Sequence, residues 1–294
     1  FRSTREHPGV ERVCGNFADS LLPLYPYRWV TDLRATNEYW PEGKQKVDAE
    51  APVYCGPGVG YDAASRRIHV RLAHTKLVVP PGLGSTYAPY RGETDPRRVP
   101  LIVAGGGPVL RLAGARHVRV QDVVVRGAAG ATVEVLDSED VELDGLTVYG
   151  GSPALRIAGT ERLRLVNTAA RGLCAPWAFR TIKYRGPAPY LVIARDGKRQ
   201  NRAFEIAYCE FTDSHDFLLP SIDGLDFHHN LVDNHNDDGL YLSGEPANRG
   251  FRIHENRLAR CLTVFSFYDF ASYHGAAGEM RTGNGAHIYR NVID

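Results

Sequence analysis

The sequence predicts an all-β protein, a parallel β-helix preceded by an N-terminal capping region. In three segments near the C-terminus an asparagine, Asn230, Asn256 or Asn291, stands between two short alternating runs. The same frame recurs upstream with other small or polar residues at that place, namely Asp122, Gly145, Asn167 and Cys209. Successive steps are 23, 22, 42, 21, 26 and 35 residues, which is a period in the low twenties with one doubled and one stretched step. Such a period is typical of stacked coils from which loops emerge.

Each repeat is expected to form one coil of short strands. Alternation with period two predicts strands that bury one face, and coils stacked about 4.8 Å apart would build a continuous core. The asparagine is expected where the strand bends, because asparagine tolerates unusual backbone angles. Its side-chain amide can also bond to the same residue of the next coil and so form a ladder. The alternative is a β-sandwich, but the sequence has few hairpin signals and the period is too even.

The repeat resembles that of the right-handed parallel β-helix superfamily, which is typified by pectate lyases and polygalacturonases. The resemblance covers about residues 101–294. It implies a right-handed parallel β-helix, and because the repeat is a folding signature it identifies no single family within the superfamily.

Residues 1–100 do not fit the repeat. They contain a stretch rich in proline and tyrosine at 21–29 and a predicted hairpin from 58–61 to 67–72. An open apolar end of a β-helix invites edge pairing unless it is covered, so this region is predicted to be a cap and to supply a wall of a ligand groove. Cys14 and Cys55 could pair within it.

An insert at residues 174–200 interrupts the rhythm of the coils. Loops on a rigid stack often carry binding groups, and this loop is rich in aromatic and basic residues that suit sugar stacking and carboxylate pairing. We therefore predict substrate contacts from Arg180, Lys183 and Tyr184. The alternative is a solvated loop without a binding role.

Composition and the two chain ends bear on partners and location. Lys plus Arg is 35 and Asp plus Glu is 34, a net charge of +1 that predicts neither nucleic acid nor a membrane as partner. The chain begins with Phe1, so we expect a processed start and a secreted protein, extracellular or periplasmic. Residues 286–294 enter a coil and stop inside it. We expect a truncated β-helix, with the remainder of its own chain or a second chain stacking on the C-terminal coil.

The densest polar constellation consists of residues 212–217 and 233–239, each of which leads into a short strand. Alignment of the two strands places His215 with Asp237 and Asp216 with Asp238, 22 residues apart. Residues one period apart lie about 5 Å apart on adjacent coils. Two carboxylates so placed repel each other, which raises the pKa of one of them. An acid and a base would then be available, as cleavage of a glycosidic bond requires.

Histidines and one arginine complete the predicted site. His215 and His235 flank the acidic residues and are candidates for proton transfer. Arg260 lies one period further on, where it could hold a substrate carboxylate. Three alternatives stay open: a structural turn at 237–239, a Ca²⁺ site on the carboxylates, and a metal role for His228 and His229 beside the ladder. We assign no metal ligand and no cofactor, with Ca²⁺ as the alternative.

Residues 236–239, Asn-Asp-Asp-Gly, are similar to the Asn-x-Asp-Gly motif of polygalacturonase-type glycoside hydrolases. This resemblance implies that Asp238 is a catalytic carboxylate. Residues 273–275, Tyr-His-Gly, are similar to the later Gly-His-Gly motif, which implies that His274 contacts substrate. The family's second acidic motif is expected near residues 260–261, where this chain has Arg-Cys instead.

These features together predict a carbohydrate-active enzyme that cleaves a polysaccharide in a groove along the β-helix. Hydrolysis by Asp216, Asp237 and Asp238 is the first expectation, and lyase or epimerase chemistry is the second. The rival class is a non-catalytic β-helix, such as an adhesin, a spike or a scaffold module. Polar residues concentrated on one set of coils favour the enzyme, because a scaffold would spread them evenly.

Overall fold

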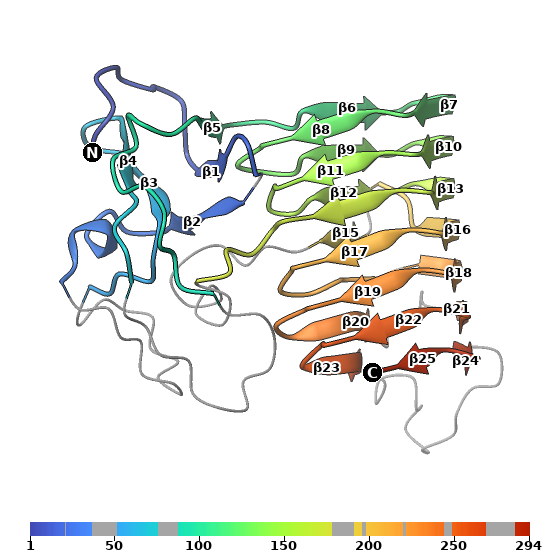
Figure 1. Cartoon of the computed structure of the whole chain (residues 1–294). Helices are drawn as coiled ribbons and strands as arrows, with labels where there is room; N and C mark the ends of the chain where they lie inside the picture. Colours follow the sequence, from blue (N-terminus) through green and yellow to red (C-terminus); the bar gives the residue numbers. More distant parts are fainter. Residues whose placement is uncertain are drawn as a thin grey trace, which may run out of the picture.

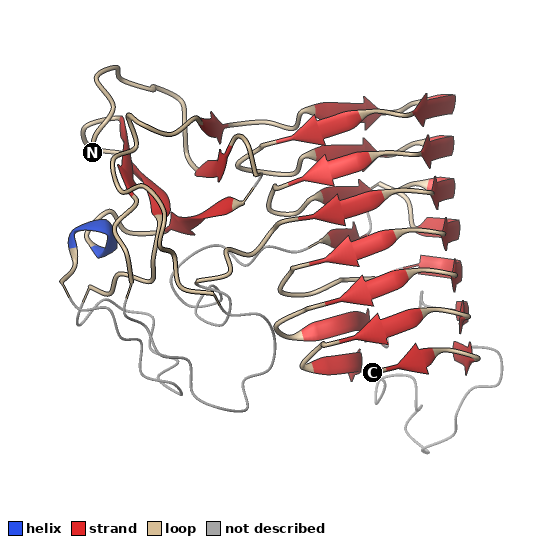
Figure 2. Ribbon diagram, in the orientation of Figure 1, coloured by secondary structure: helices blue, strands red, loops and turns tan. Residues whose placement is uncertain are grey.

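The chain folds as a parallel β-solenoid with a small N-terminal sheet at its side (Figures 1 and 2). The computed structural model describes residues 1–20, 22–36, 52–75, 88–177, 191–195, 198–219, 222–243, 249–268 and 286–294. Within these ranges the secondary structure is β-strand apart from one 3-10 turn, η1 (Asp32–Arg34). The all-β prediction and the parallel β-helix are therefore confirmed.

Three parallel sheets run along the solenoid. Most coils contribute one strand to each sheet, but the coil of residues 218–233 meets sheet III only through a single bridge between Leu218 and Tyr241. Sheet I consists of β7 (Arg116–Gln121), β10 (Glu139–Asp144), β13 (Glu161–Val166), β16 (Asn201–Ala207), β18 (Ile222–His228), β21 (Arg249–His254) and β24 (Ala286–Tyr289). Sheet II consists of β8 (Val124–Arg126), β11 (Thr147–Tyr149), β14 (Ala169–Arg171), β17 (Glu210–Thr212), β19 (Leu231–Asp233), β22 (Arg257–Ala259) and β25 (Val292–Ile293). Sheet III has one group of four strands, β6 (Leu110–Ala113), β9 (Val133–Leu136), β12 (Leu155–Ala158) and β15 (Val192–Arg195), and a pair, β20 (Asp238–Ser243) and β23 (Thr263–Tyr268).

The alternating pattern of the strands produces the core. In β10, Val141 and Leu143 point inward and are buried, whereas Glu142 between them points outward. Glu142 is in register with Arg119 on one side and Arg164 on the other, so opposite charges meet along the outer face. Stacking of the inward side chains of successive coils forms one continuous apolar core, which is the physical reason that a single coil could not fold alone.

The predicted asparagine ladder is confirmed for Asn230, Asn256 and Asn291. The side-chain amide of Asn230 donates to Oδ1 of Asn256 at 3.1 Å and to the carbonyl of Ile206 at 2.9 Å. The amide of Asn256 donates in the same way to Oδ1 of Asn291 at 2.9 Å and to the carbonyl of Phe227 at 3.0 Å. Each ladder side chain therefore satisfies a backbone N–H and a backbone carbonyl of the preceding coil.

The bend itself lies one residue before the ladder, which corrects the sequence-based alignment. The left-handed backbone occurs at His229, Glu255 and Arg290, with φ between 55° and 56°. Upstream, the residues aligned with the asparagines also fall on the bend, since Asp122, Gly145 and Asn167 have positive φ. The inward position there is held by Leu146 and Thr168, and the N–H of Leu146 donates to the Thr168 hydroxyl at 3.2 Å. Asparagine suits both neighbouring positions, so the repeat alone could not separate them.

The N-terminal residues form a separate sheet with its own core. Its strands lie in the order β4 (Arg67–Arg71), β3 (Gly58–Asp62), β2 (Pro23–Tyr27), β1 (Val13–Phe17) and β5 (Leu101–Gly105). The predicted hairpin is present as the antiparallel pair β3–β4. Cys14 and Cys55 are not joined by a disulfide, because Cys14 lies beside Ala104 of β5 whereas Cys55 packs in an aromatic core with Tyr27.

This N-terminal sheet lies beside the corner where sheet II turns into sheet III (Figure 1). The indole N–H of Trp177, from the insert, donates to the carbonyl of Pro57 at 2.9 Å and joins the two parts. Inward side chains of the first coil, such as Leu110 and Val120, are only partly buried. A capping role for residues 1–100 stays a prediction.

At the C-terminal end of the solenoid, the side chains of Val292 and Ile293 are exposed. No helix within the described ranges is long and apolar enough to cross a membrane.

Candidate functional site

The two polar segments singled out in the sequence lie next to each other, at the corner between sheet II and sheet III. The N–H of Asn236 donates to the carbonyl of Ser214 at 3.0 Å, and the N–H of Asp237 donates to the carbonyl of His215 at 3.2 Å. These bonds join successive coils just before β20. Stacking therefore brings into contact side chains that are about one period apart in the sequence.

An imidazole and two carboxylates meet at this corner and form what we call the His215 cluster, consisting of His215, Asp216 and Asp237. Nε2 of His215 lies 3.7 Å from Oδ2 of Asp216 and 3.6 Å from Oδ2 of Asp237. One nitrogen or oxygen atom of each of the three residues lies within 4.8 Å of those of the others. Nδ1 of His215 is hydrogen-bonded to Oδ1 of Asn236, which fixes the ring with Nε2 toward the carboxylates.

Exposure increases from the histidine outward through the cluster. The side chain of His215 is 4% exposed, that of Asp216 is 12% exposed and that of Asp237 is 24% exposed. The burial of His215 keeps the local dielectric low and strengthens its interaction with the two carboxylates. Asp237 is the member best placed to reach a molecule that arrives from solvent.

Asp238 follows directly and is held in a different environment. Its backbone N–H donates to Oδ1 of Asp216 at 3.0 Å, and the hydroxyl of Ser266 donates to its side chain. Burial raises the pKa of Asp238, and the nearby charges of Asp216 and Asp237 raise it further, although the Ser266 hydrogen bond opposes the shift. This direction agrees with the repulsion expected for carboxylates on adjacent coils.

His235 lies inside the coil rather than at its surface. Its two ring nitrogens lie 3.3 Å from the carbonyl oxygens of Asp238 and Phe211. Burial lowers the pKa of His235 to about 4, so the ring is neutral near pH 7. The structure thus places His235 where it holds the backbone at the start of β20, and its nitrogens are directed at main-chain groups.

The predicted substrate-binding residues divide into two groups. Arg260 is described, and its Nε donates to Oδ1 of Asp233 at 2.7 Å, so its guanidinium takes part in an ion pair on the outer surface. The other four lie outside the described residues, and they are Arg180, Lys183, Tyr184 and His274.

Both ends of the insert lie against the candidate site. The N–H of Cys174, where the insert leaves the coil, donates to the carbonyl of Asp213 at 2.9 Å. The N–H of Leu191, where the chain returns, donates to the carbonyl of Asp216 at 3.0 Å. Trp177 packs with Phe17 of the N-terminal sheet. The described ends of the insert therefore border the corner that carries the His215 cluster, and Trp177 joins one of these ends to the N-terminal sheet.

Two residues of the site were not anticipated from the sequence. Asn236 orients His215, and Ser266 donates to Asp238 from the next coil. Ser266 follows Asp238 by 28 residues, a stretched period, so extension of the repeat by one further coil could have found it. Asn236 lies inside the Asn-Asp-Asp-Gly motif, where it was interpreted only as part of a resemblance.

No protein-family model, curated protein or solved structure matches this chain. The chemistry of the His215 cluster must therefore be judged from its own groups. One imidazole nitrogen and two carboxylate oxygens suit proton transfer. The same donor set could hold a divalent cation, and its nitrogen fits a transition metal better than Ca²⁺, which prefers oxygen ligands throughout.

Proposed function

We propose that this protein is a polysaccharide-cleaving enzyme of the pectate lyase and polygalacturonase-like superfamily, with its catalytic centre at the His215 cluster. The observation that carries the proposal is the meeting of His215 with Asp216 and Asp237 from successive coils, with nitrogen–oxygen distances of 3.7 and 3.6 Å. Buried titratable groups gathered in this way are characteristic of sites where protons are transferred.

The environments of the carboxyl groups support different roles in hydrolysis. Burial raises the pKa of Asp238, which favours its protonated form and suits it to protonate the leaving oxygen of the glycosidic bond. Asp237 is the most exposed carboxylate beside the imidazole, and as a base it would take a proton from the attacking water. Nε2 of His215 lies beside Asp216 and Asp237 and would orient the Asp237 carboxylate. After each cleavage Asp237 would lose its proton to solvent and Asp238 would take one up, which restores both groups. A lyase would use the same base on a sugar C–H instead.

The proposal is tested by incubating the purified chain with a panel of neutral and uronic-acid polysaccharides and measuring new reducing ends and unsaturated products. Asp237→Asn should lower turnover by about a hundredfold or more. The matched control is Asp140→Asn, because Asp140 is an exposed carboxylate paired with Arg162 on the outer face of sheet I. It should leave turnover unchanged. If the unaltered protein cleaves no member of the panel, the proposal fails and a non-catalytic β-helix is favoured.

A further inference from the structure

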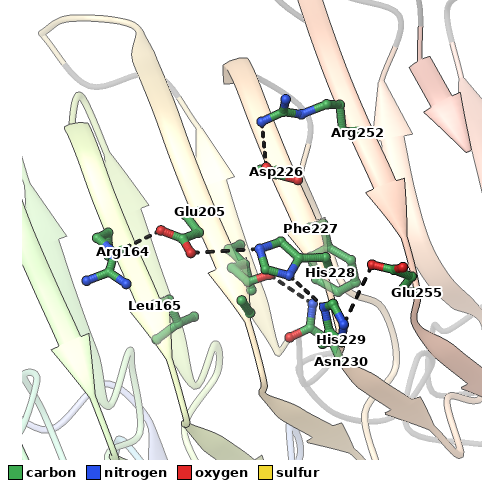
Figure 3. A network of polar contacts seen from close by, with 12 residues as sticks. Arg164, Leu165, Glu205, Asp226, Phe227, His228, His229, Asn230, Arg252 and Glu255 are labelled. Atoms are coloured by element: carbon green, nitrogen blue, oxygen red, sulfur yellow. Dashed lines mark hydrogen bonds and ion pairs between the residues drawn. The ribbon is translucent and has the colours of Figure 1, made fainter.

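A second group of titratable side chains lies on the opposite side of the ladder from the His215 cluster, at the bend between sheet I and sheet II. His228 is the last residue of β18 and His229 is the left-handed residue that follows it. Figure 3 shows the two imidazoles facing each other, with Nδ1 of His228 2.9 Å from Nδ1 of His229. We call these two residues the histidine pair.

Each imidazole of the pair presents its other nitrogen to a carboxylate. Nε2 of His228 lies 3.7 Å from Glu205, and Nε2 of His229 lies 3.6 Å from Glu255, on the coils to either side (Figure 3). Histidines that bind metals generally direct the remote ring N–H at a carboxylate or a carbonyl in this way. The arrangement therefore aims both Nδ1 atoms at one point and both Nε2 atoms at acidic groups.

When both rings are neutral, the pair cannot direct an N–H at both carboxylates and also form the bond between the two Nδ1 atoms. A neutral imidazole carries a proton on one nitrogen only. If one Nδ1–H donates to the other Nδ1, the donating ring has a bare Nε2 that faces a carboxylate. A cation bound to both Nδ1 atoms removes the conflict, because each ring then keeps its proton on Nε2, toward Glu205 or Glu255.

The distance between the two nitrogens also indicates which cations fit. Metal–nitrogen bonds of about 2.0–2.1 Å and a tetrahedral angle would place the two nitrogens about 3.3 Å apart. The observed 2.9 Å corresponds instead to an angle of about 90°, which is the angle between neighbouring ligands in tetragonal and octahedral sites. Imidazole ligands in tetragonal geometry are preferred by Cu²⁺ and Ni²⁺.

The pair is held rigidly and is open to solvent. His254 stacks on His228 with ring centres 5.1 Å apart, and Tyr208 stacks on His229 at 4.9 Å. The carboxylate of Glu205 also accepts a 2.8 Å hydrogen bond from Arg164. The side chain of His229 is 42% exposed, so a cation can arrive from solvent and keep water on its remaining positions.

We infer that His228 and His229 bind one divalent transition-metal ion through their Nδ1 atoms, with Cu²⁺ or Ni²⁺ preferred to Zn²⁺. The site is independent of the proposed polysaccharide cleavage. It uses residues on another corner of the solenoid, and its test needs no substrate.

The test is calorimetric titration of the metal-free protein with Cu²⁺, Ni²⁺ and Zn²⁺, combined with the electron paramagnetic resonance spectrum of bound Cu²⁺. One equivalent of Cu²⁺ with two nitrogen ligands is expected. His228→Gln and His229→Asn should each abolish that equivalent; asparagine is chosen because it tolerates the left-handed backbone at residue 229. Glu255→Gln should weaken binding by about tenfold, as loss of a carboxylate behind a ligand usually does.

The control variant is His117→Gln, because His117 is also an exposed histidine beside a carboxylate, Asp140, but has no second imidazole at its Nδ1. It should bind Cu²⁺ like the unaltered protein, and circular dichroism should show that all variants are folded. Retention of the equivalent in the His228 and His229 variants would overturn the inference. So would its loss in Asp237→Asn, which would place the metal in the His215 cluster.

Discussion

His235 should make the folded protein lose stability in mild acid. Its imidazole is buried, and burial lowers its pKa to about 4 from an ordinary value of 6.5. Between these two values the unfolded chain binds a proton that the folded protein does not bind. The free energy of unfolding therefore has its full value above pH 6.5 and decreases as the pH falls toward 4.

The size of the effect follows from the difference between the two pKa values. One pKa unit corresponds to about 1.4 kcal/mol, so His235 alone should cost about 3 kcal/mol by pH 4. The opposing influence is that both ring nitrogens lie 3.3 Å from carbonyl oxygens, which favours the charged ring. Burial is the larger effect because these contacts are long and His235 is only 1% exposed.

The assay is urea unfolding at several pH values between 4.5 and 8 for the unaltered protein and for His235→Gln, whose amide can bond to a carbonyl but does not titrate. The variant starts less stable, and the difference between the two proteins should shrink by about 2 to 3 kcal/mol as the pH falls. Other groups, including Asp238, titrate in both proteins and cancel in the difference. Two parallel stability curves would falsify this reasoning and would mean that the carbonyl pair holds an imidazolium.

Two further predictions concern the ladder and the site. Asn256→Ala removes the bonds to Phe227 and Asn291 and leaves buried backbone groups unsatisfied, so denaturant unfolding should show the free energy of unfolding lowered by about 2 to 4 kcal/mol. The control Asn167→Ala, at the exposed bend, should lower it by under about 1.5 kcal/mol. Equal losses in the two variants would contradict the inward ladder. Asp238→Asn should abolish glycan cleavage with the melting temperature nearly unchanged, whereas a lowered melting temperature with full cleavage per folded molecule would show that Asp238 only shapes the turn.

The solenoid could be predicted from the sequence because the features that determine it recur in every coil. Alternation in strands such as Val141–Leu143 and the recurrence of Asn230, Asn256 and Asn291 reflect burial and backbone satisfaction, which act in every coil in the same way. The alignment went wrong by one residue upstream, at Asp122, Gly145 and Asn167, because the bend and the ladder are chain neighbours with similar preferences. The bend residue has a positive φ and the ladder residue does not. A pattern of residue types does not report φ directly, so it could not distinguish these two positions.

The site was harder to predict because its contacts depend on rotamers and burial at an irregular corner. The pairing of His215 with Asp237, 22 residues apart, followed from the period. The orientation of His215 by Asn236, and the direction of His235 toward main-chain carbonyls, did not. A histidine beside an aspartate in the sequence is equally compatible with a proton carrier and with a buried structural ring, and only the position of the side chain distinguishes them.

The His215 cluster and the histidine pair lie at corners of the solenoid that differ in how strictly the fold fixes their length. The bend between sheet I and sheet II occupies two residues in every described coil, such as 229–230 and 255–256, because one must be left-handed and the next must fill the ladder. Side chains at this bend and directly before it stack in fixed register, as the imidazole of His228 does on that of His254. The corner between sheet II and sheet III has no such constraint, and its length varies from 260–262 to 172–191. That freedom permits chain segments of very different length to leave the same corner, such as the insert whose two ends are hydrogen-bonded to Asp213 and Asp216.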